Sequence, residues 1–83
     1  MNNTLLKLED AFLFLQAMKY KRENKQYSTQ ITQLMDFSIV LSGIISAQEK
    51  MPSLNHSFNA GLKLQVEEFL SIFDELKREL NDK

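Results

Sequence analysis

The side chains with the greatest scope for acid–base or metal chemistry are one histidine, His56, and several carboxylates; cysteine is absent. A catalytic or metal site needs acids, bases, nucleophiles or ligands that converge on one point. The carboxylates are instead scattered, as in Glu67-Glu68 and Asp74-Glu75, on the expected polar side of a helix. No Glu-x-x-His pair occurs, which excludes the ligand motif of di-iron helical bundles. We therefore predict a protein that is not an enzyme and holds no metal or cofactor.

A basic cluster interleaved with tyrosines is the feature best suited to nucleic acid. Its cations are Lys19, Lys21, Arg22 and Lys25, and Tyr20 and Tyr27 lie among and after them. Phosphates bind cations and bases stack on aromatic rings. The chain as a whole has ten Lys and Arg against eleven Asp and Glu, whereas nucleic-acid-binding domains are commonly strongly basic. A nucleic-acid contact through the basic cluster is therefore the alternative hypothesis, and nucleic acid is not the first expected partner.

The elements that position these residues are predicted to be helices. Leu, Lys, Glu, Gln and Met are frequent and favour helices, and no Asn-Gly or Asp-Gly turn separates alternating apolar runs. Of the 83 residues, 43% are hydrophobic and 25% are charged. This length and composition are typical of one small globular domain, which we place at 1–83.

Polar or helix-breaking segments divide the chain into three predicted helices, at about residues 4–24, 28–50 and 54–81. Ser28 or Thr29 is the expected N-cap of the second helix, and Met51-Pro52 is expected to end it. Whether residues 53–57 are helical is left open. Short connections make consecutive helices antiparallel, so the predicted fold class is all-α, an antiparallel up-down-up three-helix bundle.

The third predicted helix has one broad apolar stripe, the pattern of a helix with a single buried side. Its members are Leu54, Phe58, Leu62, Val66, Phe69, Phe73, Leu76 and Leu80. We expect Phe69 and Phe73 to lie in the core. Leu64 falls on the opposite side among charged neighbours, and it is a candidate secondary contact with a partner.

The second predicted helix is apolar on most of its sides, which predicts the most buried of the three helices. Val40 belongs to its main apolar face, and Ile39 and Ala47 widen that face. A stripe of small side chains recurs along it at every fourth residue: Ser38, Ser42 and Ser46. Gly43 lies beside this stripe, which marks either the solvent side of the helix or a place where another helix approaches closely.

The first predicted helix carries two apolar seams on nearly opposite sides. The first seam, predicted to face the core, is Leu5, Leu8, Ala11, Phe12, Leu15 and Met18. The second seam is Leu6, Leu13, Ala17 and Tyr20, with Phe14 at its margin. Leu6, Leu13 and Tyr20 are spaced by seven, as in one position of a coiled coil. A helix of a three-helix monomer needs one apolar face, so the second seam predicts a partner, either a second copy in a homodimer or another protein.

Together these observations predict a non-enzymatic protein–protein interaction module that binds and inhibits or adapts another protein. Small antiparallel bundles include bacteriocin immunity proteins, secretion chaperones and phage-encoded inhibitors, and this analogy rests on the fold alone. The N-terminal residues lack the basic start of a signal peptide. The longest apolar-rich stretch, residues 37–47, is shorter than the ~20 residues that span a bilayer. We therefore expect a cytoplasmic protein without a membrane partner.

Overall fold

The computed structural model describes residues 2–50 and 56–82. Three α-helices, α1 (Asn2–Lys19), α2 (Ser28–Lys50) and α3 (His56–Asn81), carry most of these residues, and a 3₁₀-helix, η1 (Arg22–Tyr27), precedes α2. The described residues outside the helices are Tyr20, Lys21 and Asp82, and none of the described residues is in a strand. The prediction of an all-helical chain with three long helices is therefore confirmed.

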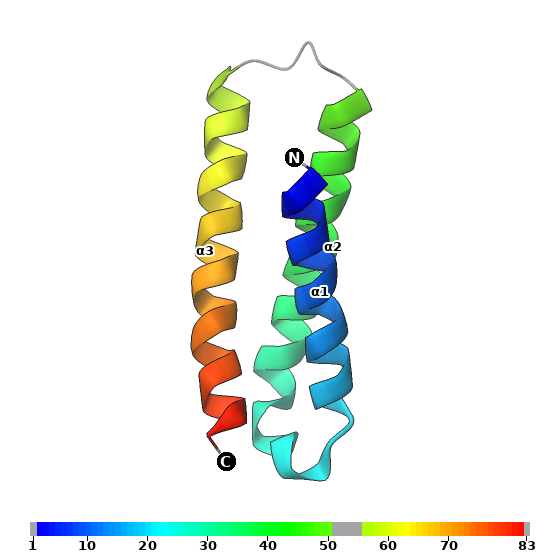
Figure 1. The fold of residues 1–83 in the computed structure, drawn as a ribbon, viewed down its shortest axis with the longest axis vertical. Helices are drawn as coiled ribbons and strands as arrows, with labels where there is room; N and C mark the ends of the chain where they lie inside the picture. The colour runs from blue at the N-terminus through cyan, green and yellow to red at the C-terminus, as the bar shows by residue number, and fades with distance from the viewer. Residues whose placement is uncertain (1, 51–55, 83) are drawn as a thin grey trace.

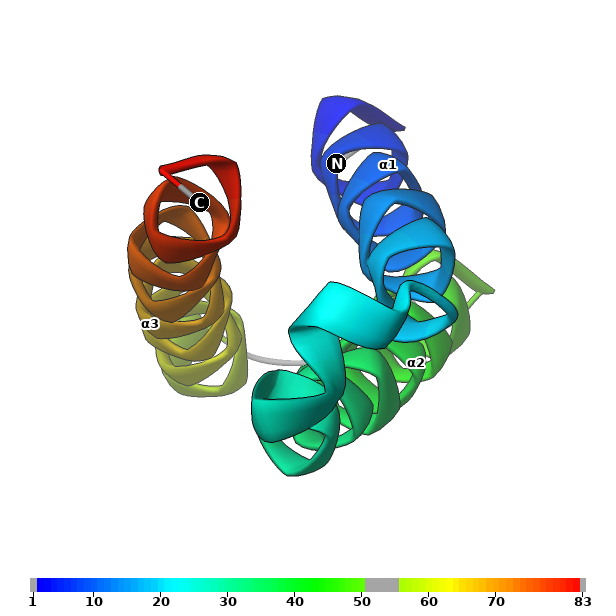
Figure 2. The ribbon, with the colours of Figure 1, turned by 90° about the horizontal axis from the view of Figure 1, so that it is seen from below.

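The helices form an elongated assembly of 46 × 20 × 18 Å. α1 and α2 lie side by side and run in opposite directions, and α3 runs in the same direction as α1 (Figure 1). α1 packs closely along α2, whereas α3 lies further from both. Viewed along the long axis, the three helices occupy the corners of a triangle and η1 crosses one end of it (Figure 2).

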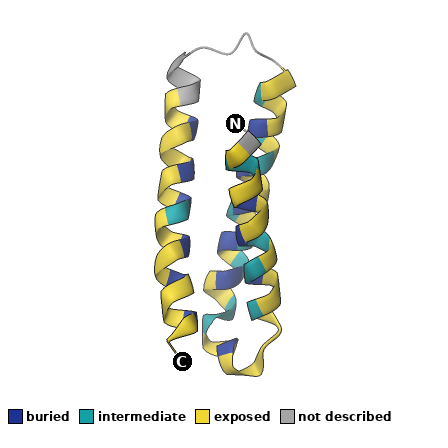
Figure 3. Ribbon diagram, viewed as in Figure 1, coloured by how far each residue is buried: buried dark blue, intermediate teal, exposed yellow. Residues whose placement is uncertain are grey.

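Buried side chains lie along the inner sides of all three helices (Figure 3). They are Leu8, Ala11 and Leu15 of α1, Ile31, Leu34, Leu41 and Ile45 of α2, and Leu62, Val66, Phe69, Phe73, Leu76 and Leu80 of α3. The Phe69 ring meets the Phe37 ring edge-on, with 5.5 Å between centroids, and stacks with the Phe73 ring at 6.1 Å. The predicted stripe of the third helix is confirmed as its buried face from Leu62 to Leu80. Leu54 and the side chain of Phe58 lie outside the described residues.

α1 ends at Lys19, whereas the sequence predicted a helix to about residue 24. Lys21 has an extended backbone, with φ −84° and ψ 129°, so the helix cannot continue through it. Asn24 is buried, and its Nδ2 donates a hydrogen bond of 3.1 Å to the Met18 carbonyl oxygen. The same carbonyl oxygen accepts a 3.2 Å bond from the Lys21 backbone N–H, so the Asn24 side chain adds a second bond that ties η1 to the last turn of α1. The predicted end was wrong because a side-chain contact between Asn24 and Met18 cannot be read from the spacing of apolar residues.

α2 has the predicted bounds, but it begins differently from the prediction. Ser28 has helical dihedrals, φ −54° and ψ −43°, and its backbone N–H donates to the Lys25 carbonyl oxygen. An N-cap residue has an extended backbone and caps with its side chain, so Ser28 is not an N-cap. Thr29 already lies within the helix, and η1 therefore continues directly into α2. The predicted break at Met51-Pro52 and the first residues predicted for α3 lie outside the described residues.

α2 has the largest share of buried and half-buried residues among the described parts of the three helices, as predicted, but its apolar residues are not all covered. Ile39 is 55% exposed, Val40 is 57% exposed and Ala47 is also exposed. The buried residues of α2 share one side of the helix, toward α1 and α3, and nothing in the described chain covers the opposite side. Val40, placed on the main face by its sequence spacing, lies on that uncovered side.

The small-residue stripe of α2 becomes more exposed along the helix, from the contact with α1 at one end to solvent at the other. Ser38 is buried, Ser42 is half-buried and Ser46 is exposed. Ser38 and Ser42 line a groove together with residues of α1, and the Ser38 hydroxyl donates a 2.7 Å hydrogen bond to the Met35 carbonyl oxygen. The small serines therefore permit close approach of α1 over part of the stripe. Gly43 takes no part in this contact, because a Cβ there would meet no atom within 4 Å.

By length and composition alone, the segment Arg22–Lys50 is long and apolar enough to cross a membrane, and it is the single such segment among the described residues. In the structure, 28% of its most apolar stretch is buried. A core helix of a soluble protein passes the same test of length and composition, so this feature by itself assigns no location.

Candidate protein-binding surface

The second seam lies along the side of α1 that faces away from α2 and α3. Leu6 is 57% exposed, Leu13 is 52% exposed, Tyr20 is 79% exposed, and Ala17 is also exposed. Leu8, in the first seam, is fully buried. The two seams are nearly opposite at 100° per residue, so burial of the first seam leaves the second in solvent.

Phe14, at the margin of the second seam, packs against α3 instead. Its ring meets the Phe73 ring edge-on, with 5.7 Å between centroids and 89° between the ring planes. The Nζ of Lys77 lies 5.2 Å from the centroid of the Phe14 ring, within the range of a cation–π contact. The structure therefore separates Phe14 from Leu6, Leu13, Ala17 and Tyr20, and the exposed seam is narrower than the predicted one.

A groove of about 380 Å³ between α1 and α2 adds apolar surface that the sequence analysis missed. It is lined by Leu5, Leu8, Glu9, Phe12, Ser38, Ile39 and Ser42. Ile39 contributes the most exposed apolar side chain of this set. The sequence did contain a signal for this groove. Ile39 directly follows Ser38, and a residue beside a stripe of small side chains lies at the edge of the contact with the neighbouring helix.

The basic cluster is exposed and lies at the end of the molecule where α3 also ends. Lys19 closes α1, Lys21 lies in the link, and Arg22 and Lys25 belong to η1. A hollow at this end is lined by Met18, Lys21, Glu23, Asn24, Leu80 and Asn81. Lys21 therefore lies beside the C-terminal turn of α3, where a cation is favoured by the helix dipole.

Leu64 lies apart from the second seam. Its side chain is 65% exposed on α3, and helical spacing places it on the side away from the buried stripe. A single exposed leucine is common on protein surfaces and is not in itself a contact site. Leu64 is therefore useful chiefly as a matched control for the leucines of the second seam.

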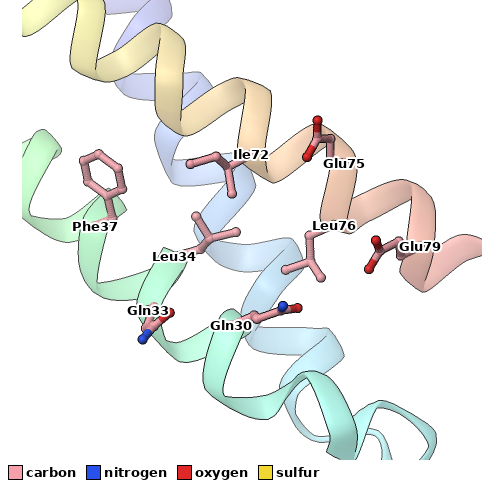
Figure 4. Close-up of a pocket in the computed structure, with 8 residues that line it drawn as sticks. All are labelled: Gln30, Gln33, Leu34, Phe37, Ile72, Glu75, Leu76 and Glu79. Atoms are coloured by element: carbon pink, nitrogen blue, oxygen red, sulfur yellow. The ribbon is translucent and has the colours of Figure 1, made fainter.

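A groove of about 390 Å³ lies between α2 and α3, and α1 passes behind it (Figure 4). Its lining residues are Gln30, Gln33, Leu34 and Phe37 of α2 and Ile72, Glu75, Leu76 and Glu79 of α3. Leu34 and Leu76 are buried at its floor, and Ile72 is exposed. Helical spacing alone placed Glu75 on a polar, solvated face of α3, so the groove could not be predicted from the sequence.

A third interhelical groove, of about 340 Å³, lies between α1 and α3. Each wall contributes one cation and one carboxylate, Lys7 and Asp10 from α1 and Lys77 and Asp74 from α3. Its lining is therefore balanced in charge. Among residues 2–50 and 56–82, no three His, Cys, Asp or Glu side chains gather closely enough to hold a metal ion.

These grooves and the second seam are the surfaces from which a function can be argued. No protein-family model, no curated protein and no solved structure matches the chain. The features that bear on function are therefore the exposed side chains, their spacing and the charge around them.

Proposed function

We propose that this chain is a non-enzymatic protein–protein interaction module, an up-down-up three-helix bundle that binds another protein and inhibits or adapts it. The second seam carries the proposal. Leu6, Leu13 and Tyr20 are each more than half exposed along the side of α1 that is turned away from the core. Large contiguous apolar strips on a protein surface mark sites of interaction with other molecules, and a partner that covers this strip removes it from water.

A partner helix fits the spacing of the second seam. Leu6 and Leu13 repeat at the heptad interval, and Ala17 is small enough for a second helix to approach closely. In an antiparallel pairing of α1 with its own copy, Lys7 would lie near Asp10 of the second copy. The proposed complex is a homodimer, or a heteromer in which the target protein covers the same seam.

The variant Leu13→Glu tests this proposal, because it places a charge in the middle of the second seam and leaves the buried seam intact. We expect sedimentation analysis to show a folded monomer where the parent chain is a dimer, or loss of the target protein in pull-downs. Leu64→Glu is the matched control, since Leu64 is also more than half exposed and lies on α3. A parent chain that is monomeric at ~50 micromolar, and whose Leu13→Glu variant retains the same captured protein, would show that the second seam is not an interface.

A nucleic-acid-associated regulator is the second candidate function, and the exposure of all four cations of the basic cluster favours it. Phosphate contacts weaken steeply with salt. A gel shift that is present at low salt, falls steeply as salt rises and is lost in Lys19→Ala/Lys25→Ala would support this candidate. Absence of any shift with duplex DNA or single-stranded RNA would exclude it.

A further inference from the structure

The groove between α2 and α3 combines an apolar floor with charge of one sign. Leu34 and Leu76 form the floor, and exposed Ile72 extends it toward solvent. Glu75 and Glu79 stand along the α3 side of the groove (Figure 4). They are four residues apart on a helix, so their Cβ atoms lie about one helical turn, roughly 5–6 Å, from each other.

No lysine or arginine is among the described residues that line this groove. The α1–α3 groove, in contrast, has a lysine and an aspartate on each wall. The chain as a whole is nearly neutral, at −1. The negative charge beside the α2–α3 groove is therefore a local property, and it favours an occupant that brings positive charge.

The opposite rim adds hydrogen-bonding capacity without charge. It carries the carboxamides of Gln30 and Gln33, which lie on α2 across the groove from the two carboxylates (Figure 4). A carboxamide both donates and accepts hydrogen bonds, so this rim accommodates polar side chains of a bound segment without selecting their charge. The selection for positive charge comes from the α3 side alone.

We propose that the α2–α3 groove binds a cationic amphipathic helix of a second protein. An apolar side chain of that helix lies against Ile72 and the leucine floor, and two Lys or Arg residues one turn apart face Glu75 and Glu79. Helices that dock in grooves present apolar anchors at such intervals. This contact uses no residue of the second seam, so it goes beyond the function proposed above.

The position of the groove favours a different protein over a second copy as its occupant. The chain's own exposed run of cations and tyrosine, Lys19-Tyr20-Lys21, is at the end of α1, and α1 lies behind the groove (Figure 4). Unlike surfaces on different sides of a molecule join copies head to tail, which produces open chains unless the rotation closes a ring. A separate protein fills the groove without that consequence. With the second seam on the far side, the module then has two surfaces that can be occupied together, as an adaptor requires.

Binding of a designed probe tests the proposal. The probe is a fluorescein-labelled 14-residue helical peptide of Leu and Lys with one apolar face, and its Leu and Glu counterpart is the control peptide. We expect the cationic peptide to bind, with methyl NMR shifts at Ile72, Leu34 and Leu76 and none at Leu6 or Leu13. Shifts confined to the second seam, or no binding at up to ~1 millimolar, would overturn the proposal.

Paired variants separate specific recognition from general charge attraction. Glu75→Gln/Glu79→Gln should raise the dissociation constant about three- to thirtyfold, the range expected for losing two exposed ion pairs. Asp36→Asn/Glu67→Gln removes the same charge from exposed positions outside the groove and should leave the affinity nearly unchanged. Equal weakening by both pairs, or equally tight binding of the Leu and Glu peptide, would show that the groove does not select a cationic helix.

Two further measurements separate this proposal from the one on the second seam. Leu13→Glu should leave the affinity for the cationic peptide unchanged, and Glu75→Gln/Glu79→Gln should leave any dimer of the parent chain intact. Self-association that Glu75→Gln/Glu79→Gln abolishes would identify a second copy as the occupant of the groove and would overturn the assignment to a different protein.

Discussion

α3 and α2 differ in how their apolar residues relate to the core. In α3, the apolar stripe from Leu62 to Leu80 is buried, and the remaining sides are mostly polar apart from exposed Leu64 and Ile72. In α2, apolar residues occur on most sides, yet Ile39 and Val40 are more than half exposed. Each helix of a three-helix assembly has its neighbours on one side, so burial follows the position of those neighbours. The apolar content of a helix does not by itself determine how much of it is buried.

The same comparison separates the apolar residues that the core explains from those that it does not. The stripe of α3 is fully accounted for by the core. On α2 and α1, the exposed residues Ile39, Leu6 and Leu13 are left over after the core is complete. α1 and α2 therefore carry exposed apolar residues that the core does not use, and α3 carries few. A protein that binds another protein needs exposed apolar surface of this kind.

The largest expected effect that tests this comparison is in the α3 stripe. Phe69→Ala should reduce the free energy of unfolding by about 3–5 kcal/mol, because Phe69 is fully buried between Phe37 and Phe73 and its removal leaves a cavity. Val40→Ala on α2 should change it by less than about 0.5 kcal/mol. Urea unfolding followed by circular dichroism measures both. Similar losses in the two variants would contradict the difference between the helices.

The sequence was sufficient for elements whose limits are set by local signals. The periodicity of residues 62–80 predicted the buried face of α3, and the polar segment before Ser28 predicted where α2 begins. It also separated the two seams of α1, because opposite faces of a helix follow directly from spacing. These predictions needed no knowledge of which helices are neighbours.

The sequence was insufficient where the answer depends on a contact between distant residues. The end of α1 depends on Asn24, whose side chain reaches back to the Met18 carbonyl oxygen. The exposure of Val40 depends on α1 and α3 sharing one side of α2. The α2–α3 groove depends on placing Glu75 opposite Gln33, which no spacing along one helix specifies.

An intermediate effect on stability is expected at Asn24. This residue is polar but buried, whereas Val40 is apolar but exposed. Asn24→Ala should reduce the free energy of unfolding by about 1–1.5 kcal/mol, because the hydrogen bond from the buried Asn24 amide to the Met18 carbonyl oxygen is lost, while the bond from the Lys21 N–H remains. Gln26→Ala, at an exposed position of the same 3₁₀-helix, is the control and should have little effect. Thermal melts of the two variants measure the difference. Equal melting temperatures would show that Asn24 does not hold the end of α1.

The smallest expected effect is at Gly43, on the uncovered side of α2. Glycine in a helix interior costs about 0.8–1 kcal/mol relative to alanine. Gly43 has no positive φ, and an added Cβ would meet no atom within 4 Å, so nothing in the described chain offsets that cost. Gly43→Ala should therefore stabilise the chain by about 0.8–1 kcal/mol, which for a domain of this size raises Tm by roughly 3–8 °C.

Gly61→Ala is the matched control for this last prediction, because Gly61 lies in α3 and an added Cβ there also meets no atom within 4 Å. If the outer side of α2 faces solvent, both substitutions should raise Tm at every protein concentration. If a partner helix instead packs closely on Gly43, the methyl group of Gly43→Ala would obstruct it, and Gly43→Ala alone would weaken association. A concentration-dependent loss of Tm in Gly43→Ala, absent from Gly61→Ala, would therefore show that the uncovered side of α2 is an interface, whereas a gain in both variants confirms that helix propensity alone acts there.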